Sequence, residues 1–212
     1  MRILFVSNWF PYPPDNGTRQ RNYNLIKQLS KNNEVALISA FRGSGWPDTH
    51  RLGHLKRYCQ EVYFAPRLNH SGHTARSVSE LTQLRPPWIT QPWNVEIARM
   101  VVEVLNSFKP DLILLSEILN LPIFDEIALS VPVVLEQFEV GVLWQRVDKA
   151  QGLLKLRRKA ARALLTAYLQ HRLTRVQGTT VPNEEERKIF QTVMPTSGSP
   201  ELIPNGVDVE YF

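Results

Sequence analysis

Short runs of consecutive apolar residues alternate along this chain with longer segments whose apolar residues recur at helical spacing. Strands that are buried on both faces of a parallel sheet have such continuous apolar runs, and helices connect them. The pattern therefore predicts an α/β, Rossmann-like fold with a doubly wound parallel sheet. The predicted strands are residues 3–6, 35–39, 62–65, 112–115, 133–135, 176–180 and 202–203.

Two segments in the first half of the chain have the apolar period of a helix. Residues 18–30 form the first, and Thr18 is its expected N-cap because it follows Gly17 directly. Residues 94–108 form the second, which Pro110 ends. Residues 67–93, between the third predicted strand and this second helix, have no clear period and are expected to include irregular loop.

A third, longer helix is predicted over residues 153–173. Its expected apolar face consists of Leu153, Leu156, Ala160, Leu164 and Ala167. A shorter helix is expected to begin at the acidic run 184–186, where negative charge is favourable, so these acids are interpreted as structural.

The chain carries a net charge of +5, but its positive charge is concentrated in one segment. Residues 146–175 contain nine Lys and Arg and one acid, Asp148, which leaves the rest of the chain net negative. A generally basic surface would indicate a nucleic-acid binder, whereas one basic element indicates a local anionic contact. We therefore expect no nucleic-acid partner.

Composition argues against several other classes of protein. The single cysteine, Cys59, excludes an intrachain disulfide and a cysteine-rich metal site. His50 and His54 have i, i+4 spacing but no evident third ligand, so no metal is expected. The longest apolar runs, such as residues 112–115, are too short to span a membrane, and a cytoplasmic location is the expectation.

The loop after the first predicted strand is the first candidate site. It comprises the eleven residues 7–17, whereas roughly two to six residues are usual at such a connection. Asn16, Gly17, Thr18 and Arg19 would bring backbone amides to a helix N-terminus, which attracts a diphosphate or another anion. Arg19 and Arg21 lie where the helix dipole disfavours cations, which indicates a negative group nearby. The alternative is a turn glycine beside solvated arginines.

Sequences near both ends of the chain resemble one known family. The first is Met1-Arg2-Ile3-Leu4-Phe5-Val6-Ser7 with the following Pro11-Tyr12-Pro13-Pro14-Asp15-Asn16-Gly17, and the second is Pro204-Asn205-Gly206-Val207-Asp208. Together they resemble the N-terminal domain of group 1 (family 4) glycosyltransferases of the GT-B fold. The resemblance covers the whole chain and is densest at residues 1–40 and 130–212. Many members of the family have Gly-Gly where this chain has Asn16-Gly17.

The resemblance implies that residues 1–203 are the acceptor-binding lobe of a two-domain enzyme. Residues 204–212 would be the inter-domain hinge, and the donor-binding C-terminal domain would be absent. The implied reaction is glycosyl transfer from a nucleotide-sugar donor (UDP- or GDP-sugar), with retention and without an obligatory metal. Its implied roles are polysaccharide, glycolipid or cell-envelope glycan synthesis, with a sugar or lipid-linked acceptor. This lobe would bind no cofactor and would be inactive alone, because the donor-binding groups belong to the other domain.

The loop after residues 133–135 is the second candidate site. The family has an acidic residue there, then a His-Asn-Val-Glu-like stretch, then an arginine. Aligned on Arg146, Glu136 matches the acidic position, Phe138 stands where histidine is common, and Gly141 where glutamate is common. Phenylalanine cannot hydrogen-bond or move a proton. Either the alignment slips by a residue and Glu136 or Glu139 reaches the acceptor instead, which makes these two the catalytic candidates, or the chain belongs to a divergent subgroup. The alternative for Glu136 is a structural acid at a helix start.

Ser116 and Glu117 follow the strand predicted at residues 112–115. The carboxyl ends of parallel strands meet at one edge of a sheet, where α/β proteins bind ligands. We therefore expect both residues to touch the acceptor.

The basic segment is the third candidate. Lys155, Arg158, Lys159 and Arg162 lie apart from the predicted apolar face of their helix. Contact with anionic lipid head groups would place the protein peripherally at the inner face of the cell membrane. The alternative is a solvated helix surface, and many relatives have a segment like Lys155-Leu156-Arg157-Arg158 here.

Two other functions stay open. One is a non-enzymatic Rossmann-like module that binds an anionic membrane surface or a partner protein through the basic helix. The other is a relative of nucleotide- or sugar-phosphate-binding epimerases or dehydrogenases. The absence of Gly-x-Gly-x-x-Gly after the first strand argues against the second.

Overall fold

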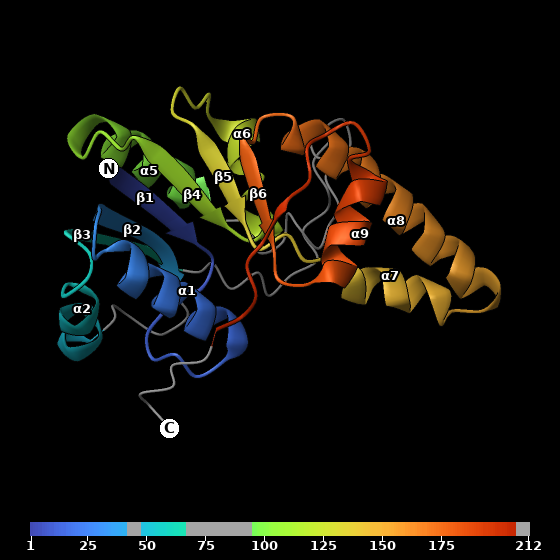
Figure 1. Cartoon of the computed structure of the whole chain (residues 1–212), viewed down its shortest axis with the longest axis horizontal. Coiled ribbons are helices and arrows are strands. Elements are labelled where there is room, and N and C mark those ends of the chain that lie inside the picture. Colours follow the sequence, from blue (N-terminus) through green and yellow to red (C-terminus); the bar gives the residue numbers. More distant parts are fainter. Residues whose placement is uncertain (42–47, 67–94, 207–212) are drawn as a thin grey trace.

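The computed structural model describes residues 1–41, 48–66 and 95–206. Within these residues, seven strands form one sheet in the order β3-β2-β1-β4-β5-β6-β7, and every pairing is parallel (Figure 1). This arrangement confirms the predicted fold class. The strands are β1 (Arg2–Ser7), β2 (Glu34–Phe41), β3 (Glu61–Pro66), β4 (Leu112–Ser116), β5 (Val133–Glu136), β6 (Gly178–Val181) and β7 (Glu201–Leu202).

Helices cover both faces of the sheet, because alternate strand residues are buried on opposite sides. In β1, Ile3 and Phe5 belong to a core that includes Ile26, whereas Leu4 and Val6 belong to a core that includes Val101. The helices are α1 (Gly17–Leu29), α2 (Thr49–Leu55), α5 (Val95–Ser107), α6 (Ile123–Glu126), α7 (Gly141–Asp148), α8 (Gly152–Leu173) and α9 (Glu184–Val193), with a 3₁₀ helix η1 (Ile118–Asn120).

The strand order contains one reversal, between β1 and β4. These strands are hydrogen-bonded neighbours, with Val6 opposite Leu115, although β2 and β3 separate them in the sequence. The chain leaves β1 toward one edge of the sheet and leaves β4 toward the other. In sheets of this kind, ligands bind in the crevice outside the carboxyl ends of the strands at such a reversal.

The predicted strands and helices are present, with differences at their ends. β6 begins at Gly178 instead of residue 176, because the chain first makes a turn in which the Val176 N–H bonds to the Leu173 carbonyl. The N-cap of α1 is Asn16 and not Thr18, since the Asn16 side chain accepts a hydrogen bond from the Arg19 N–H at 3.0 Å. The irregular loop predicted over residues 67–93 lies outside the described residues.

The predicted apolar face of α8 is wrong. Leu153 and Leu156 are 75% and 64% exposed, while the buried residues of α8 lie in its second half. Only that half packs on the rest of the molecule, whereas the first half projects outward beside α7 (Figure 1). The apolar spacing therefore predicted the helix correctly, but it could not show which turns of the helix reach the core. The buried residues are Leu165, Tyr168, Leu169, Arg172 and Leu173.

Candidate active site

A pocket of about 320 Å³ opens at the carboxyl ends of three neighbouring strands. Residues that follow β1, β4 and β5 all contribute to its wall, so the pocket lies at the reversal in strand order. Its lining combines an aromatic ring, two aliphatic side chains, a hydroxyl, an amide and two carboxyl groups. The lining residues are Trp9, Thr18, Glu117, Ile118, Leu119, Gln137 and Glu139.

Glu117 has a strained backbone at the edge of this pocket. Its φ and ψ angles are 69° and 153°, a region that essentially only glycine adopts and that costs a larger residue about 1–3 kcal/mol. Its N–H donates to the carbonyl oxygen of Glu136 at 2.9 Å, which joins the loops after β4 and β5. Strain of this kind persists where the surrounding structure fixes a residue, and it is common at functional sites.

The Glu117 carboxyl is also electrostatically perturbed. Its pKa is raised to about 7, chiefly by burial and also by the nearby Glu136 and Glu139 carboxylates, while side-chain hydrogen bonds with Thr18 and Trp9 lower it. Its Oε2 atom is buried and has no hydrogen-bond partner among the described residues. A carboxyl group that titrates near neutral pH can both accept and donate a proton there. Glu117 is therefore the strongest acid–base candidate in the structure.

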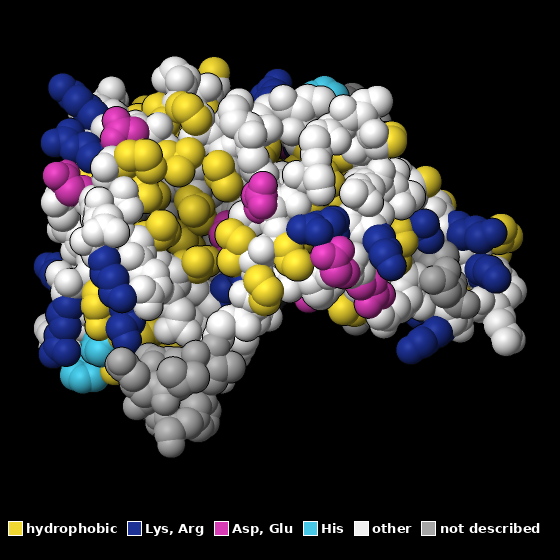
Figure 2. Space-filling view, viewed as in Figure 1, with side chains coloured by type: hydrophobic (Ala, Val, Ile, Leu, Met, Phe, Trp, Pro, Cys, Tyr) yellow, Lys and Arg dark blue, Asp and Glu magenta, His cyan; other side chains and the backbone are white. Residues whose placement is uncertain are grey.

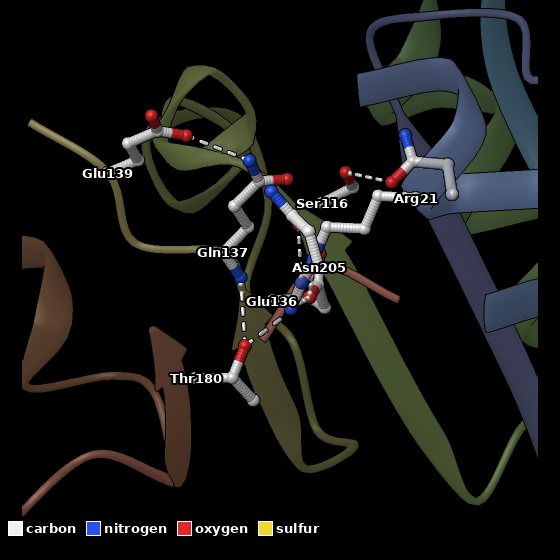
Figure 3. Close-up of polar contacts among 8 residues, drawn as sticks. Arg21, Ser116, Glu136, Gln137, Glu139, Thr180 and Asn205 are labelled. Atoms are coloured by element: carbon white, nitrogen blue, oxygen red, sulfur yellow. Dashed lines mark hydrogen bonds and ion pairs between the residues drawn. The ribbon is translucent and has the colours of Figure 1, made fainter. Parts of the chain in front are cut away.

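Glu136 lies behind the pocket, in a buried ion pair with Arg21 (Figure 3). The two side chains are 2% and 4% exposed, and the Arg21 Nε donates to the Glu136 Oε1 at 2.7 Å. Burial raises the pKa of Glu136, and the contacts with Arg21 and Thr180 lower it. Of the two residues predicted to be catalytic, Glu139 lines the pocket and Glu136 does not.

The negative groups expected beside Arg19 and Arg21 come from the chain itself. Arg19 bonds both carboxylate oxygens of Asp15, at 2.8 and 2.9 Å, and Arg21 bonds Glu136. Arg21 also donates through Nη1 to the Asn205 side-chain oxygen at 2.8 Å (Figure 3). The segment predicted to be a hinge therefore touches the same arginine that is paired beneath the pocket.

The remaining residues of the predicted phosphate site are placed at the start of α1. Asn16 and Gly17 are exposed, and the Asn16 side chain caps the helix. A Cβ atom at Gly17 would have nothing within 4 Å, so its backbone faces open space. Of this group only Thr18 lines the pocket. Phosphate binding here stays a prediction.

Ser116 and Glu139 have different positions relative to the pocket. The Ser116 hydroxyl is fully buried and donates to Asn22 at 2.8 Å, and the Asn22 amide donates to Ser7 at 2.9 Å. These bonds tie β4, α1 and β1 together below the pocket. Glu139 is exposed, lines the pocket, and accepts a hydrogen bond from the Gln137 amide at 2.8 Å.

Four lining residues were not predicted from the sequence: the apolar Ile118 and Leu119, and Trp9 and Gln137. Gln137 has a φ of 60°, and its Oε1 is buried without a hydrogen-bond partner among the described residues. No sequence signal marks a left-handed glutamine. Trp9 follows β1 within two residues, and an aromatic side chain in that loop could have been recognised as a candidate for contact with a ligand.

Phe138 and Gly141 are explained by packing. Phe138 is fully buried and makes an edge-to-face contact with Phe190, with ring centroids 5.2 Å apart. A Cβ at Gly141 would lie 2.5 Å from the Glu186 Oε1. Glu186 accepts the N–H groups of Val140 and Gly141 at 2.9 and 2.8 Å, so it caps α7 from α9. Glu186 belongs to the acidic run 184–186 that was interpreted as structural. Its role is structural, but the helix that it caps is α7 and not its own helix α9.

The cations of the basic helix lie apart from the pocket. Lys155 and Lys159 are exposed, Arg158 is half-buried, and the Arg162 guanidinium lies over the Trp144 ring at 4.8 Å from its centroid. In the described ranges, no three His, Cys, Asp or Glu side chains are grouped closely enough to hold a metal ion. No helix within those ranges combines the length and apolar character that crossing a membrane requires.

Comparison with known proteins agrees with the fold. The sequence matches no protein-family model, and no curated protein matches it in sequence. Among solved structures, sucrose-phosphate synthase from Thermosynechococcus elongatus is similar, with a TM-score of 0.59 at 12% identity, over 100% of this chain and 50% of that one.

Two plant proteins are also similar. They are Phytolacca americana UGT2, complexed with UDP-2-fluoro-glucose and pterostilbene (TM-score 0.54, 11% identity), and a UDP-glucosyltransferase from Polygonum tinctorium capable of glucosylating indoxyl (0.51, 11%). The two similarities extend over 98% and 97% of this chain and over 54% and 52% of the plant proteins, respectively. It thus spans about half the length of the structures it matches, and it has the α/β, Rossmann-like fold of one half of a GT-B glycosyltransferase.

Proposed function

We propose that this chain is the acceptor-binding half of a nucleotide-sugar-dependent glycosyltransferase. The observation that carries the proposal is the pocket at the reversal between β1 and β4, into which Glu117 places a carboxyl group that titrates near neutral pH. The acceptor sugar would occupy this pocket. Trp9 offers a flat apolar surface to a sugar ring, while Gln137 and Glu139 offer hydrogen-bonding groups to its hydroxyls.

Glu117 would orient the attacking hydroxyl of the acceptor. Its ionised carboxylate can accept a hydrogen bond from that hydroxyl, and a pKa raised to about 7 keeps both the ionised and the protonated form accessible near neutral pH. The acceptor oxygen forms the new bond to the sugar while the bond to the departing nucleoside diphosphate breaks, and the hydroxyl proton passes to the Glu117 carboxylate. Retention at the anomeric carbon is part of the proposal and is tested by the configuration of the product.

The donor side would be supplied by a second lobe joined through residues 204–212. Support comes from the fact that the chain matches half of several two-lobed enzymes, two of which bind or use UDP-sugars according to their descriptions. A UDP- or GDP-sugar would therefore be held between the lobes, above the carboxyl ends of the strands. Acceptors in polysaccharide, glycolipid or cell-envelope glycan synthesis fit this role, at the cytoplasmic side of the cell.

Saturation-transfer NMR tests the acceptor site with the 212-residue chain and a panel of alkyl glycosides and short oligosaccharides. At least one sugar is expected to receive saturation with an affinity that changes through neutral pH. Glu117→Gln should remove this pH dependence, and Glu201→Gln, an exposed carboxylate on β7, should preserve it. Binding of NAD by the chain, with no sugar bound at any pH, would contradict the proposal in favour of the dehydrogenase alternative.

Activity of the chain alone provides a second test. Incubated with labelled UDP-glucose or GDP-mannose and the sugars that bind, the 212-residue chain is expected to transfer no sugar. Steady-state transfer by this chain would contradict the proposal that it is only one half of the enzyme.

A further inference from the structure

The α7–α8 hairpin ends in an exposed apolar tip. We call residues 149–159 the hairpin tip. Within it, Leu153, Leu154 and Leu156 are 75%, 48% and 64% exposed. They are the only leucines among the exposed large hydrophobic residues of the described ranges. Three leucines kept in water within four positions contribute nothing to the core, so their grouping indicates that something covers them.

Contacts within the hairpin hold this tip in place. Gly152 begins α8 with a φ of 55°, a left-handed conformation that suits glycine and sets the direction of the helix. Farther along α8, the Arg162 guanidinium lies over the Trp144 ring of α7, and Trp144 is only 8% exposed. The leucines are thus presented at the end of two paired helices.

The tip is strongly positive. Residues 149–159 contain five Lys and Arg and no Asp or Glu, and Lys149, Lys155, Arg157 and Lys159 are exposed. The first turn of α8 has no acidic residue, although the helix dipole favours acids there and disfavours cations. Figure 2 shows Lys and Arg side chains gathered beside hydrophobic ones at the far end of this projection. The charge therefore points to an anionic partner outside the chain.

We propose that the hairpin tip docks on an anionic lipid bilayer, with its leucines inserted among the acyl chains and its cations on the head groups. A bilayer interface offers an apolar layer directly below a negatively charged one. The tip has leucines for the first and cations for the second within eleven residues. A nucleic acid or a soluble anion would pair with the cations and leave the leucines in water. The proposal uses no residue of the pocket and stands independently of the proposed function.

Docking at the tip would place the pocket near the membrane. Glu139 lies two residues before α7, and α7 has eight residues, which corresponds to a length of about 12 Å. A lipid-linked acceptor would therefore present its sugar at a distance that the pocket can reach.

Co-sedimentation with vesicles tests the proposal directly. The chain is expected to bind vesicles of phosphatidylcholine with phosphatidylglycerol, and not vesicles of phosphatidylcholine alone. Leu153→Gln with Leu156→Gln should weaken binding by about tenfold or more, because each leucine loses its transfer into an apolar layer. Lys155→Gln with Lys159→Gln should weaken it by about fivefold per lysine, and added salt should weaken it too.

Matched variants separate this effect from general changes in surface. Val95→Gln with Val102→Gln removes two exposed apolar residues of α5, and Lys31→Gln with Lys188→Gln removes two exposed lysines. Both variants should bind the anionic vesicles like the unaltered chain. No binding of the unaltered chain, or binding that the Leu153/Leu156 variant retains in full, would overturn the proposal.

Two further readouts address insertion and the alternative occupants. An environment-sensitive dye on Leu153→Cys should shift to shorter wavelength on anionic vesicles, and binding without that shift would overturn the insertion of the leucines. Sedimentation without lipid should show a monomer. A dimer that the Leu153/Leu156 variant breaks would assign the tip to a second copy of the chain and overturn lipid docking.

Discussion

Loss of the buried Arg21–Glu136 ion pair should destabilise the protein strongly. In Arg21→Met, the Glu136 carboxylate would keep its buried position, 2% exposed, without its cation. Removal of one partner of a buried pair costs about 3–5 kcal/mol, since the remaining charge is left uncompensated. For a chain of this length, that corresponds to a fall in melting temperature of about 6–20 °C. The bond from Arg21 to Asn205 would be lost as well.

The loss of stability in Arg21→Met should depend on pH in a defined direction. Burial already raises the pKa of Glu136 above its usual value, and Arg21 opposes that rise, so the variant should have a still higher pKa in the folded state. An acid whose pKa is higher when folded loses stability as pH rises from its unfolded pKa to its folded one. The cost of Arg21→Met should therefore be largest at about pH 8 and should shrink toward about pH 5.

Urea denaturation of the purified chain at both pH values measures this cost. Arg19→Met is the matched control, because its Asp15 partner is 54% exposed and such a pair contributes less than about 1 kcal/mol. Adding Glu136→Gln to Arg21→Met should recover much of the loss by removing the unpaired charge. A cost no larger than that of Arg19→Met, or one that is equal at both pH values, would show that the buried pair does not stabilise the fold.

Three further predictions concern other sites. The pKa of Glu117 is about 7 in the folded chain, so this carboxyl should cost stability as pH rises from about 4.5 to 7. Glu117→Gln should reduce that loss and be more stable above pH 7 by up to about 3 kcal/mol in urea denaturation, and an unchanged pH dependence would contradict it. Gly141→Ala should cost about 1–3 kcal/mol because its Cβ would collide with Glu186, whereas Gly53→Ala, with open space in α2, should be neutral or stabilising by about 0.5–1 kcal/mol; equal effects would contradict the steric argument. Burial raises the pKa of the Cys59 thiol to about 12, so a thiol reagent should modify it in urea but hardly in the native chain, and rapid native labelling would contradict its burial.

Sequence patterns predicted the sheet because its strands are buried on both faces. A continuous apolar run such as residues 112–115 needs cover on both of its faces, which a strand in such a sheet has. All seven predicted strands are present. A parallel sheet also places the loops after residues 3–6, 112–115 and 133–135 at the same edge, although the order of the strands was not predicted. The pocket lies at that place, and Thr18, Glu117 and Glu139 were among the candidates for it.

The roles of individual carboxyl groups depended on contacts that the sequence does not contain. Glu136 was the main catalytic candidate, but Arg21, 115 positions away, holds it in a buried pair. Glu117 was expected only to touch the acceptor, and its left-handed backbone and desolvated carboxyl arise only after β4 and β5 are placed side by side. The apolar period of α8 likewise could not reveal that its first turns project beyond the core.

The pocket at the carboxyl ends of β1, β4 and β5 is proposed to bind a sugar acceptor. The most direct measurement follows the indole N–H resonance of Trp9, assigned by comparison with Trp9→Phe, as alkyl glycosides and oligosaccharides are added to the chain. We expect an acceptor sugar to shift the Trp9 signal in proportion to its occupancy and to leave the buried Trp144 signal unchanged. If sugars bind while the Trp9 signal stays fixed, or if no sugar of the panel moves it, the pocket is not the acceptor site.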